Sequence, residues 1–147
     1  MPNELDALSR KALLNIARQA VTAAVNGQRL PKLDLDSLPA ALSQPGASFV
    51  TLTEHGRLRG CIGTLEAYQP LAKDVQQRAV QAAMEDPRFS PVTQKELPQI
   101  EVEVSRLTAP IPLIYEKAED LPNLLRPNVD GVILQHGRQR ATFLPQV

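Results

Sequence analysis

The chain has 147 residues, which suits a single domain or one body with a small lobe and excludes a large multidomain assembly. Sixteen Lys and Arg residues balance sixteen Asp and Glu residues, so the chain has no net charge with which to wrap nucleic acid or bind an anionic membrane. One Cys and two His residues exclude both an intrachain disulfide framework and a four-ligand Cys/His zinc site.

The start of the chain carries no targeting signal that we recognise. It lacks the basic start and the apolar run of a secretory signal, and no stretch reaches the ~18 apolar residues of a membrane span. We therefore expect a cytoplasmic protein with no membrane partner. Aromatic residues make up only 3% of the chain and Trp is absent. Few side chains could therefore stack on nucleic-acid bases, and nucleic acid is not expected as a partner.

The N-terminal third of the chain predicts one amphipathic helix followed by a connection. Apolar residues recur at helical spacing between residues 5 and 25, with Asn3 as the expected N-cap and Asn26-Gly27 as the stop signal. Residues 30–46 contain three prolines among several leucines, a spacing too interrupted for a long helix. We interpret them as a Pro/Leu-rich connecting loop that places leucines against the core.

The middle of the chain predicts a hairpin, a helix and a strand. Residues 47–53 and 57–64 are rich in strand-forming types and flank a turn that contains Gly56. An apolar stripe predicts a second helix over residues 70–85, which ends before Pro87. Residues 100–105 alternate strictly between apolar and polar types, which is typical of a strand with one wet face.

The last third predicts smaller elements. We expect a helical turn over residues 118–125 and a second hairpin, with strands at 132–134 and 140–144. Separate helices and antiparallel hairpins indicate the α+β class, with an antiparallel sheet body and two main helices. His55 and His136 fall at the predicted hairpin tips, where we interpret them as turn residues and not as partners of the cysteine.

Four ordered motifs resemble the AMMECR1 family. Residues 58–63 read L-R-G-C-I-G, which is the family's signature, and residues 86–91 match its D-P-R-F-x-P segment. Residues 101–105 and 141–147 are similar to two further family motifs. The chain is therefore identified as a member of this family, as a single domain over residues 1–147. Family members typically continue with a Trp and a further helix, whereas this sequence ends at Val147, so we interpret it as C-terminally short.

The resemblance implies an α+β body with a smaller lobe. It also implies a shared pathway, because members in many bacteria and archaea are grouped with a Memo-like protein and a radical S-adenosylmethionine enzyme. These two proteins are accordingly candidate partners. The resemblance implies no reaction, and the cofactor is unknown. No dinucleotide, P-loop, zinc-protease or serine-hydrolase motif supports a reaction either.

The L-R-G-C-I-G run contains the first candidate site residues. Cys61 lies between Gly60 and Gly63, which remove side-chain cover and allow a ligand or another chain to approach. Alternation along the strand predicts that Arg57, Arg59 and Cys61 share a face, where positive charge would activate the thiol and hold a carboxylate or phosphate. The alternative is that Cys61 is a small, buried core residue.

The later motifs supply the remaining candidates. Glu101, Glu103 and Ser105 share a strand face with the two carboxylates about 7 Å apart, a pair suited to acid–base work or simply to the wet face of a sheet. The resemblance places this face opposite the Arg-Gly-Cys segment. Asp86 and Arg88 could border the same cleft, or Asp86 could only terminate the preceding helix.

Two main hypotheses follow from these residues; a weaker third is a nucleic-acid-related regulatory role, which would require salt-dependent binding. In the first, the protein is a small enzyme or enzyme component: Arg59 holds a small anionic substrate, Cys61 supplies a thiolate and a glutamate (Glu101 or Glu103) transfers the proton. Gly60, Gly63, Ser105, Asp86 and Arg88 would then contribute to substrate binding, with no metal. In the second, the protein is a non-catalytic adaptor whose glycine-rich surface docks the pathway's proteins, with Cys61 structural. A pocket of ligand size around a reactive thiol favours the enzyme, and a flat patch favours the adaptor.

Overall fold

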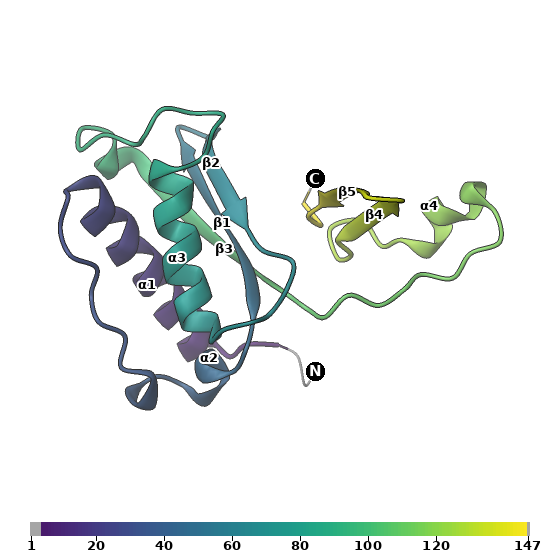
Figure 1. Ribbon diagram of the computed structural model, residues 1–147, viewed down its shortest axis with the longest axis horizontal. Coiled ribbons are helices and arrows are strands. Elements are labelled where there is room, and N and C mark those ends of the chain that lie inside the picture. The colour runs from purple at the N-terminus through teal and green to yellow at the C-terminus, as the bar shows by residue number, and fades with distance from the viewer. Residues whose placement is uncertain (1–3, 147) are drawn as a thin grey trace. The chain divides into compact units, whose positions relative to one another are not determined.

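The computed structural model describes residues 4–146 and divides into two compact units, one ending at Ala109 and the other beginning at Pro110. The first unit holds, in chain order, α1 (Ala7–Val25), the 3-10 turn η1 (Leu35–Ser37), α2 (Ala40–Ser43), β1 (Ala47–Glu54), β2 (Arg57–Gly63), α3 (Leu71–Met84), the 3-10 turn η2 (Leu97–Gln99) and β3 (Ile100–Leu107) (Figure 1). The two main helices, the hairpin and the strand were all expected from the sequence.

The first unit is built of two layers. Its three strands form an antiparallel sheet in the order β2-β1-β3, and α1 and α3 lie side by side on one face of it (Figure 1). The core between the layers is aliphatic and includes Leu13, Ile16, Val21, Leu42, Val50, Leu52, Leu71, Val75 and Ile100. Burial of each such Leu, Ile or Val side chain contributes about 1.5–3 kcal/mol to folding.

The helix boundaries differ in detail from the prediction. The N-cap of α1 is Asp6, whose side chain accepts a hydrogen bond from the Ser9 amide at 2.7 Å. The Ser9 side chain, and after it the Ser9 amide, lowers the pKa of Asp6. Asn3, the predicted cap, lies outside the described residues. Gly27 adopts φ +65° at the other end of α1, as its stop signal predicts.

The 30–46 connection is not only loop, because η1 and α2 form within it. Asp34 caps η1 through a hydrogen bond to the Asp36 amide, and Pro39 directly precedes α2. Both elements are single turns, short enough to fit between the prolines. The predicted packing of the leucines is confirmed, since Leu42 is fully buried and Leu33, Leu35 and Leu38 pack against the core.

A β-bulge changes the faces predicted for β2. The hairpin turns through His55 and Gly56, both at positive φ, so that Arg57 pairs with Glu54. The register then shifts, and Leu52 faces Gly60 with Arg59 as the extra residue. The predicted shared face of Arg57, Arg59 and Cys61 is therefore wrong. Strict alternation cannot continue through a bulge, and β2 contains one.

The second unit is small and open. It contains the 3-10 turn η3 (Ala118–Asp120), α4 (Leu121–Leu124) and a hairpin of β4 (Val132–His136) and β5 (Gln139–Phe143). Within its described residues no side chain is buried. The predicted turn and hairpin are confirmed here, and with them the α+β class. None of the helices within residues 4–146 is long and apolar enough to cross a membrane.

Gly60 is the residue that allows α3 to pack directly on β2. A Cβ atom at this position would overlap the backbone carbonyl of Ala82, and Gly60 itself is buried. The close approach of helix and strand therefore requires glycine.

We predict that Gly60→Ala lowers the free energy of unfolding by about 3 kcal/mol, because the obstructing atom is backbone and cannot rotate away. Urea unfolding measures the change. Leu58→Ala, at a 43% exposed position on the same strand, is the control and should change stability by less than about 0.5 kcal/mol. A Gly60→Ala protein as stable as the control would contradict the close packing.

Candidate functional site

One row of polar side chains crosses the sheet on the face that α1 and α3 leave open. Thr51 on β1 pairs with Cys61 on β2 and with Glu103 on β3, and the Thr51 hydroxyl lies 3.3 Å from the Cys61 sulfur. Strands are spaced about 4.8 Å apart, so the Cα atoms of Cys61 and Glu103 are roughly 10 Å apart. Thr51 therefore lies between the thiol and the carboxylate.

The register brings further predicted site residues to the same face. Glu101 pairs with Thr53, while Ser105 and Gly63 both pair with Phe49. We call this surface the open face; its residues are Phe49, Thr51, Thr53, Cys61, Gly63, Glu101, Glu103 and Ser105. Five of the nine predicted site residues thus lie together, although they come from two strands, β2 and β3, that β1 separates.

Asp86 and Arg88 close the outer edge of β2 at Cys61. The carboxylate of Asp86 accepts a hydrogen bond from the Cys61 amide at 2.9 Å, and Arg88 donates to the Cys61 carbonyl at 3.2 Å. The Arg88 guanidinium also binds Asp86, with contacts of 2.8 and 3.0 Å. These side chains replace the hydrogen bonds that a neighbouring strand would make.

Arg88 lowers the pKa of Asp86 well below its usual range, and the Cys61 amide acts in the same direction against the opposing effect of burial. Asp86 is 4% exposed, and its lowered pKa keeps it an anion inside the fold. The geometry gives Asp86 and Arg88 this structural task. Sequence reasoning weighed Asp86 as a helix terminator or a cleft residue and did not foresee its bond to Cys61.

Arg59 binds an internal carboxylate. Its Nε and Nη2 atoms donate to the two oxygens of Glu96 at 2.8 and 3.2 Å. Its Nη1 and Nη2 atoms donate to the carbonyls of Ser90 and Pro91. The guanidinium therefore holds the 90–96 segment in place, where the sequence predicted a clamp for a small anion.

Glu96 is the partner that sequence reasoning missed. It also accepts hydrogen bonds from the Thr93 amide and hydroxyl at 2.7 and 2.9 Å. The pKa of Glu96 falls to about 2, chiefly because of the Arg59 bond and next because of the Thr93 amide. The spacing of Thr93 and Glu96 is that of a capping box, which is the signal that could have identified it.

The two glycines of the signature do not open space for a ligand. Gly60 is covered by the Ala82 carbonyl, and a Cβ atom on Gly63 would overlap the ring of Phe49. The predicted approach to the backbone is thus made by α3 and by an aromatic side chain of the protein itself.

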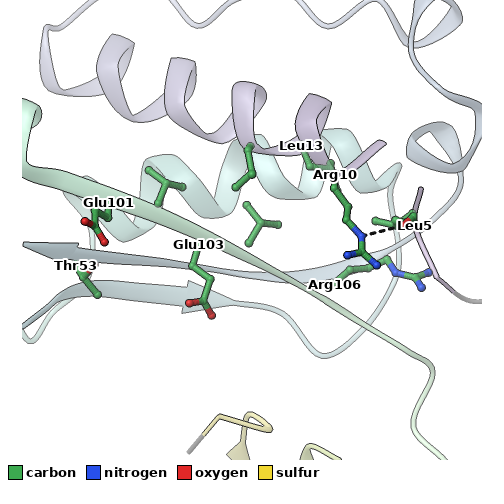
Figure 2. Close-up of a pocket in the computed structure, with 10 residues that line it drawn as sticks. Leu5, Arg10, Leu13, Thr53, Glu101, Glu103 and Arg106 are labelled. Atoms are coloured by element: carbon green, nitrogen blue, oxygen red, sulfur yellow. Dashed lines mark hydrogen bonds between the residues drawn. The ribbon is translucent and has the colours of Figure 1, made fainter. Parts of the chain in front are cut away.

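A groove of about 430 Å³ follows the free edge of β3 (Figure 2). It is lined by Leu5, Arg10, Leu13, Leu14, Thr53, Glu101, Val102, Glu103, Val104 and Arg106. A second hollow surrounds the hairpin tip, at Glu54, His55, Arg57, Leu58 and Arg59. Cys61 lines neither of them. Among residues 4–146, no three His, Cys, Asp or Glu side chains gather as metal ligands.

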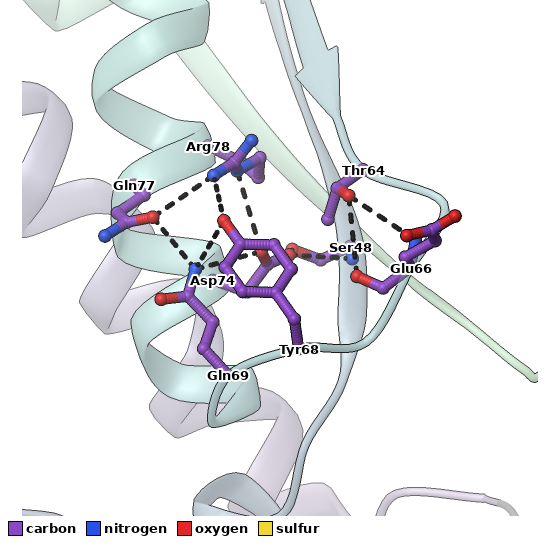
Figure 3. Close-up of polar contacts among 8 residues, drawn as sticks. All are labelled: Ser48, Thr64, Glu66, Tyr68, Gln69, Asp74, Gln77 and Arg78. Atoms are coloured by element: carbon purple, nitrogen blue, oxygen red, sulfur yellow. Dashed lines mark hydrogen bonds and ion pairs between the residues drawn. The ribbon is translucent and has the colours of Figure 1, made fainter.

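A second polar cluster joins α3 to the start of β1 (Figure 3). Asp74, fully buried, accepts hydrogen bonds from the Ser48 amide and hydroxyl at 2.9 and 2.6 Å. Gln69 donates to its other oxygen, and Arg78 lies 3.7 Å from that oxygen. These contacts lie on the helix side of the sheet. Their effect is to fix the direction in which β1 leaves the preceding turn.

The chain is similar to known proteins of one family. The AMMECR1 family profile matches residues 14–147. A protein of Methanothermobacter thermautotrophicus is 44% identical over 137 residues, which cover 93% of this chain and 71% of that protein. A protein of Aeropyrum pernix is 38% identical over 150 residues, covering 99% of this chain and 63% of that protein.

Among solved structures, the crystal structure of the uncharacterised protein PH0010 from Pyrococcus horikoshii is similar with a TM-score of 0.86 and 32% identity. The match covers 95% of this chain and 70% of that one. These relatives are longer than the part of them that this chain matches.

We predict that Glu96→Gln removes an acid-sensitive contribution to stability. The pKa of Glu96 lies near 2 in the folded protein and at 4.5 ordinarily, so its contribution is present above about pH 4.5 and is lost as the pH falls toward 2. The variant should be less stable than wild type by about 1.5 kcal/mol at pH 7 and equally stable near pH 2. Urea unfolding across this range measures the difference. A gap that is absent at pH 7, or unchanged at pH 2, would contradict the ion pair.

Proposed function

The chain belongs to the AMMECR1 family, and we propose from the geometry that it is a non-catalytic interaction module. Neither the family profile nor the solved relative names a reaction. In this proposal the open face and the adjoining edge of β3 dock partner proteins. The two-layer core serves as the rigid support.

One observation carries the proposal: the two arginines among the predicted substrate-binding residues, Arg59 and Arg88, are bound to internal partners. Arg59 binds Glu96 and two carbonyls, and Arg88 binds Asp86 and the Cys61 carbonyl. Freeing either one for a ligand would leave a buried or half-buried carboxylate without its cation, which is costly. This arrangement favours contact of the open face with a protein surface over capture of a small anion by these arginines.

We propose as partners the two proteins that the family resemblance implies, a radical S-adenosylmethionine enzyme and a Memo-like protein, in the cytoplasm. A sheet face with small and polar side chains, next to an exposed strand edge, suits a protein partner of moderate affinity. Cys61 then serves the sheet through its backbone, which Asp86 and Arg88 hold.

A second candidate function is the enzyme component, and the row of Cys61, Thr51 and Glu103 favours it. A small molecule lying over Thr51 would contact the thiol on one side and the carboxylate on the other. In that case Cys61 would supply a thiolate and Glu103 would transfer the proton of the thiol. Glu101 lies two residues from Glu103 on the same strand face and could take the same role.

We predict that Thr51→Arg weakens binding to the purified radical S-adenosylmethionine enzyme or Memo-like protein at least tenfold, because the new side chain projects from the middle of the open face. Calorimetric titration measures the affinity. Leu8→Arg, at a 68% exposed position on α1, is the control and should bind like wild type. If neither protein binds wild type, or if both variants bind as wild type does, the proposed module is wrong.

The pH profile of Cys61 alkylation by iodoacetamide distinguishes the two candidates. The Arg59 guanidinium is directed to Glu96, so we predict that Arg59→Ala leaves the alkylation rate of folded protein within about twofold between pH 6 and 9. Intact-mass spectrometry measures the rate, and Arg59→Lys controls for loosening of the 90–96 segment. A tenfold loss of rate at pH 7 in Arg59→Ala, restored by Arg59→Lys, would instead support an arginine-activated thiolate.

A further inference from the structure

The two outer edges of the sheet are treated differently. On β2 the amide and carbonyl of Cys61 face outward and are bound by the side chains of Asp86 and Arg88. A foreign strand cannot pair there without displacing both. Such a closed edge is the usual protection against unwanted strand pairing.

Among the described residues of the first unit, the edge of β3 is closed only at its start. Arg18 on α1 donates to the Ile100 carbonyl at 2.7 Å. This bond shows that the Ile100 carbonyl points away from β1, toward the outside of the sheet. In an antiparallel ladder every second residue faces the same side, so the backbone amides and carbonyls of Val102, Val104 and Arg106 also face outward. Within the described first unit, β3 pairs only with β1.

The groove beside this edge has the properties of a strand-binding site. Its sides are apolar where Leu13, Leu14 and Val104 contribute, and Leu14 is 44% exposed. Its charges are separated along the strand (Figure 2). Glu101 and Glu103 lie toward one end, and Arg10 and Arg106 lie toward the other.

The basic end already has one weak partner. Arg10 donates to the Leu5 carbonyl and approaches Glu4 at 3.7 Å, but this ion pair is well exposed and such pairs contribute little. A carboxylate arriving at the groove can therefore compete for Arg10. Arg106 lines the same end.

We propose that the β3 edge is a strand-addition site for an extended peptide segment of a partner protein. The segment runs antiparallel to β3, with an acidic side chain near its start facing Arg10 and Arg106. It carries basic side chains near its end, facing Glu101 and Glu103, and apolar β-branched residues opposite Val102 and Val104. Main-chain hydrogen bonds supply the affinity and the charges set the direction. This inference rests on the proposed function and names the chemistry of the partner.

Charge pairing favours such a segment over a second copy of this chain. Continuation of the sheet requires an even register, so that equivalent faces stay on one side. Consider two copies of the chain that pair their β3 edges antiparallel about a two-fold axis. If the axis passes through Glu103, the carboxylate of one copy lies opposite the same carboxylate of the other. An axis at Val104 places Arg106 opposite Val102. In neither register does Arg106 lie opposite a glutamate. A segment of the stated charge pattern, in contrast, places an opposite charge at both the acidic and the basic end of the groove.

The test uses a fluorescein-labelled peptide of sequence TETVKVK, amidated at its C-terminus, and fluorescence anisotropy with the whole chain. Three control peptides are matched to it. One exchanges the charges (TKTVEVE) and should bind at least tenfold more weakly. The other pair carries N-methyl groups on alternate amides: methylation of the amides that face β3 should abolish binding, and methylation of the outward amides should leave it within about threefold.

Two variants of the protein locate the site. Val104→Pro removes an outward amide and leaves the pairing with β1 in place, so it should weaken peptide binding at least tenfold relative to Val104→Ala. Leu14→Glu should weaken binding, whereas Leu8→Glu, outside the groove on the same helix, should not. If Val104→Pro does not fold, the methylated peptides still test whether the peptide binds through main-chain hydrogen bonds.

Several results would overturn the proposal. The charge-exchanged or strand-facing methylated peptide could bind as well as the original, or no peptide could bind at all. The chain could also sediment as a dimer that Val104→Pro dissociates, which would assign the groove to a second copy. Partner binding lost in Thr51→Arg but unchanged in Val104→Pro would sustain the proposed module and reject strand addition. Peptide binding without any binding of the two partner proteins would sustain strand addition and reject the proposed module with these partners.

Discussion

The carboxylate of Asp86 is the contact on which the geometry of the sheet depends. It is buried, it binds the Cys61 amide, and Arg88 both neutralises it and binds the Cys61 carbonyl. Together with the bulge at Arg59, this fixes β2 so that Gly60 faces α3 and Cys61 faces the open side. The signature and the D-P-R-F-S-P segment are therefore parts of a single structural unit, although 25 residues separate Cys61 from Asp86.

Because the β2 edge is closed at Cys61, the β3 edge is the one at which another strand could pair with the sheet. The protein supplies charged side chains to complete one edge, while the backbone of Val102, Val104 and Arg106 remains directed into a groove with apolar walls and separated charges. The open face continues directly into that groove through Thr53, Glu101 and Glu103. One continuous surface thus offers both side-chain contacts and main-chain pairing, which is what an interaction module needs.

Much of the fold could be predicted from the sequence, because helical and strand periodicity is strong in α1, α3, β1 and β3. The face shared by Cys61, Gly63, Glu101, Glu103 and Ser105 also followed from alternation and the family resemblance. The roles of Arg59 and Arg88 could not be predicted. A bulge shifts every later residue of a strand, and the partners of these arginines, Glu96 and Asp86, lie in segments whose path depends on tertiary packing. The buried Asp74 was missed for the same reason: within a helix its spacing is that of any polar residue.

Amide hydrogen exchange of the whole chain, followed residue by residue with and without the partner segment, tests the unequal edges most directly. In the free protein, the Cys61 amide should be protected like the core, because Asp86 holds it, while the amides of Val102, Val104 and Arg106 should exchange quickly and alternate with slow amides at Glu101, Glu103 and Ser105. Addition of the segment should protect the three fast amides and leave Cys61 unchanged. Slow exchange at all of β3 in the free protein, or fast exchange at Cys61, would contradict one closed edge and one open edge.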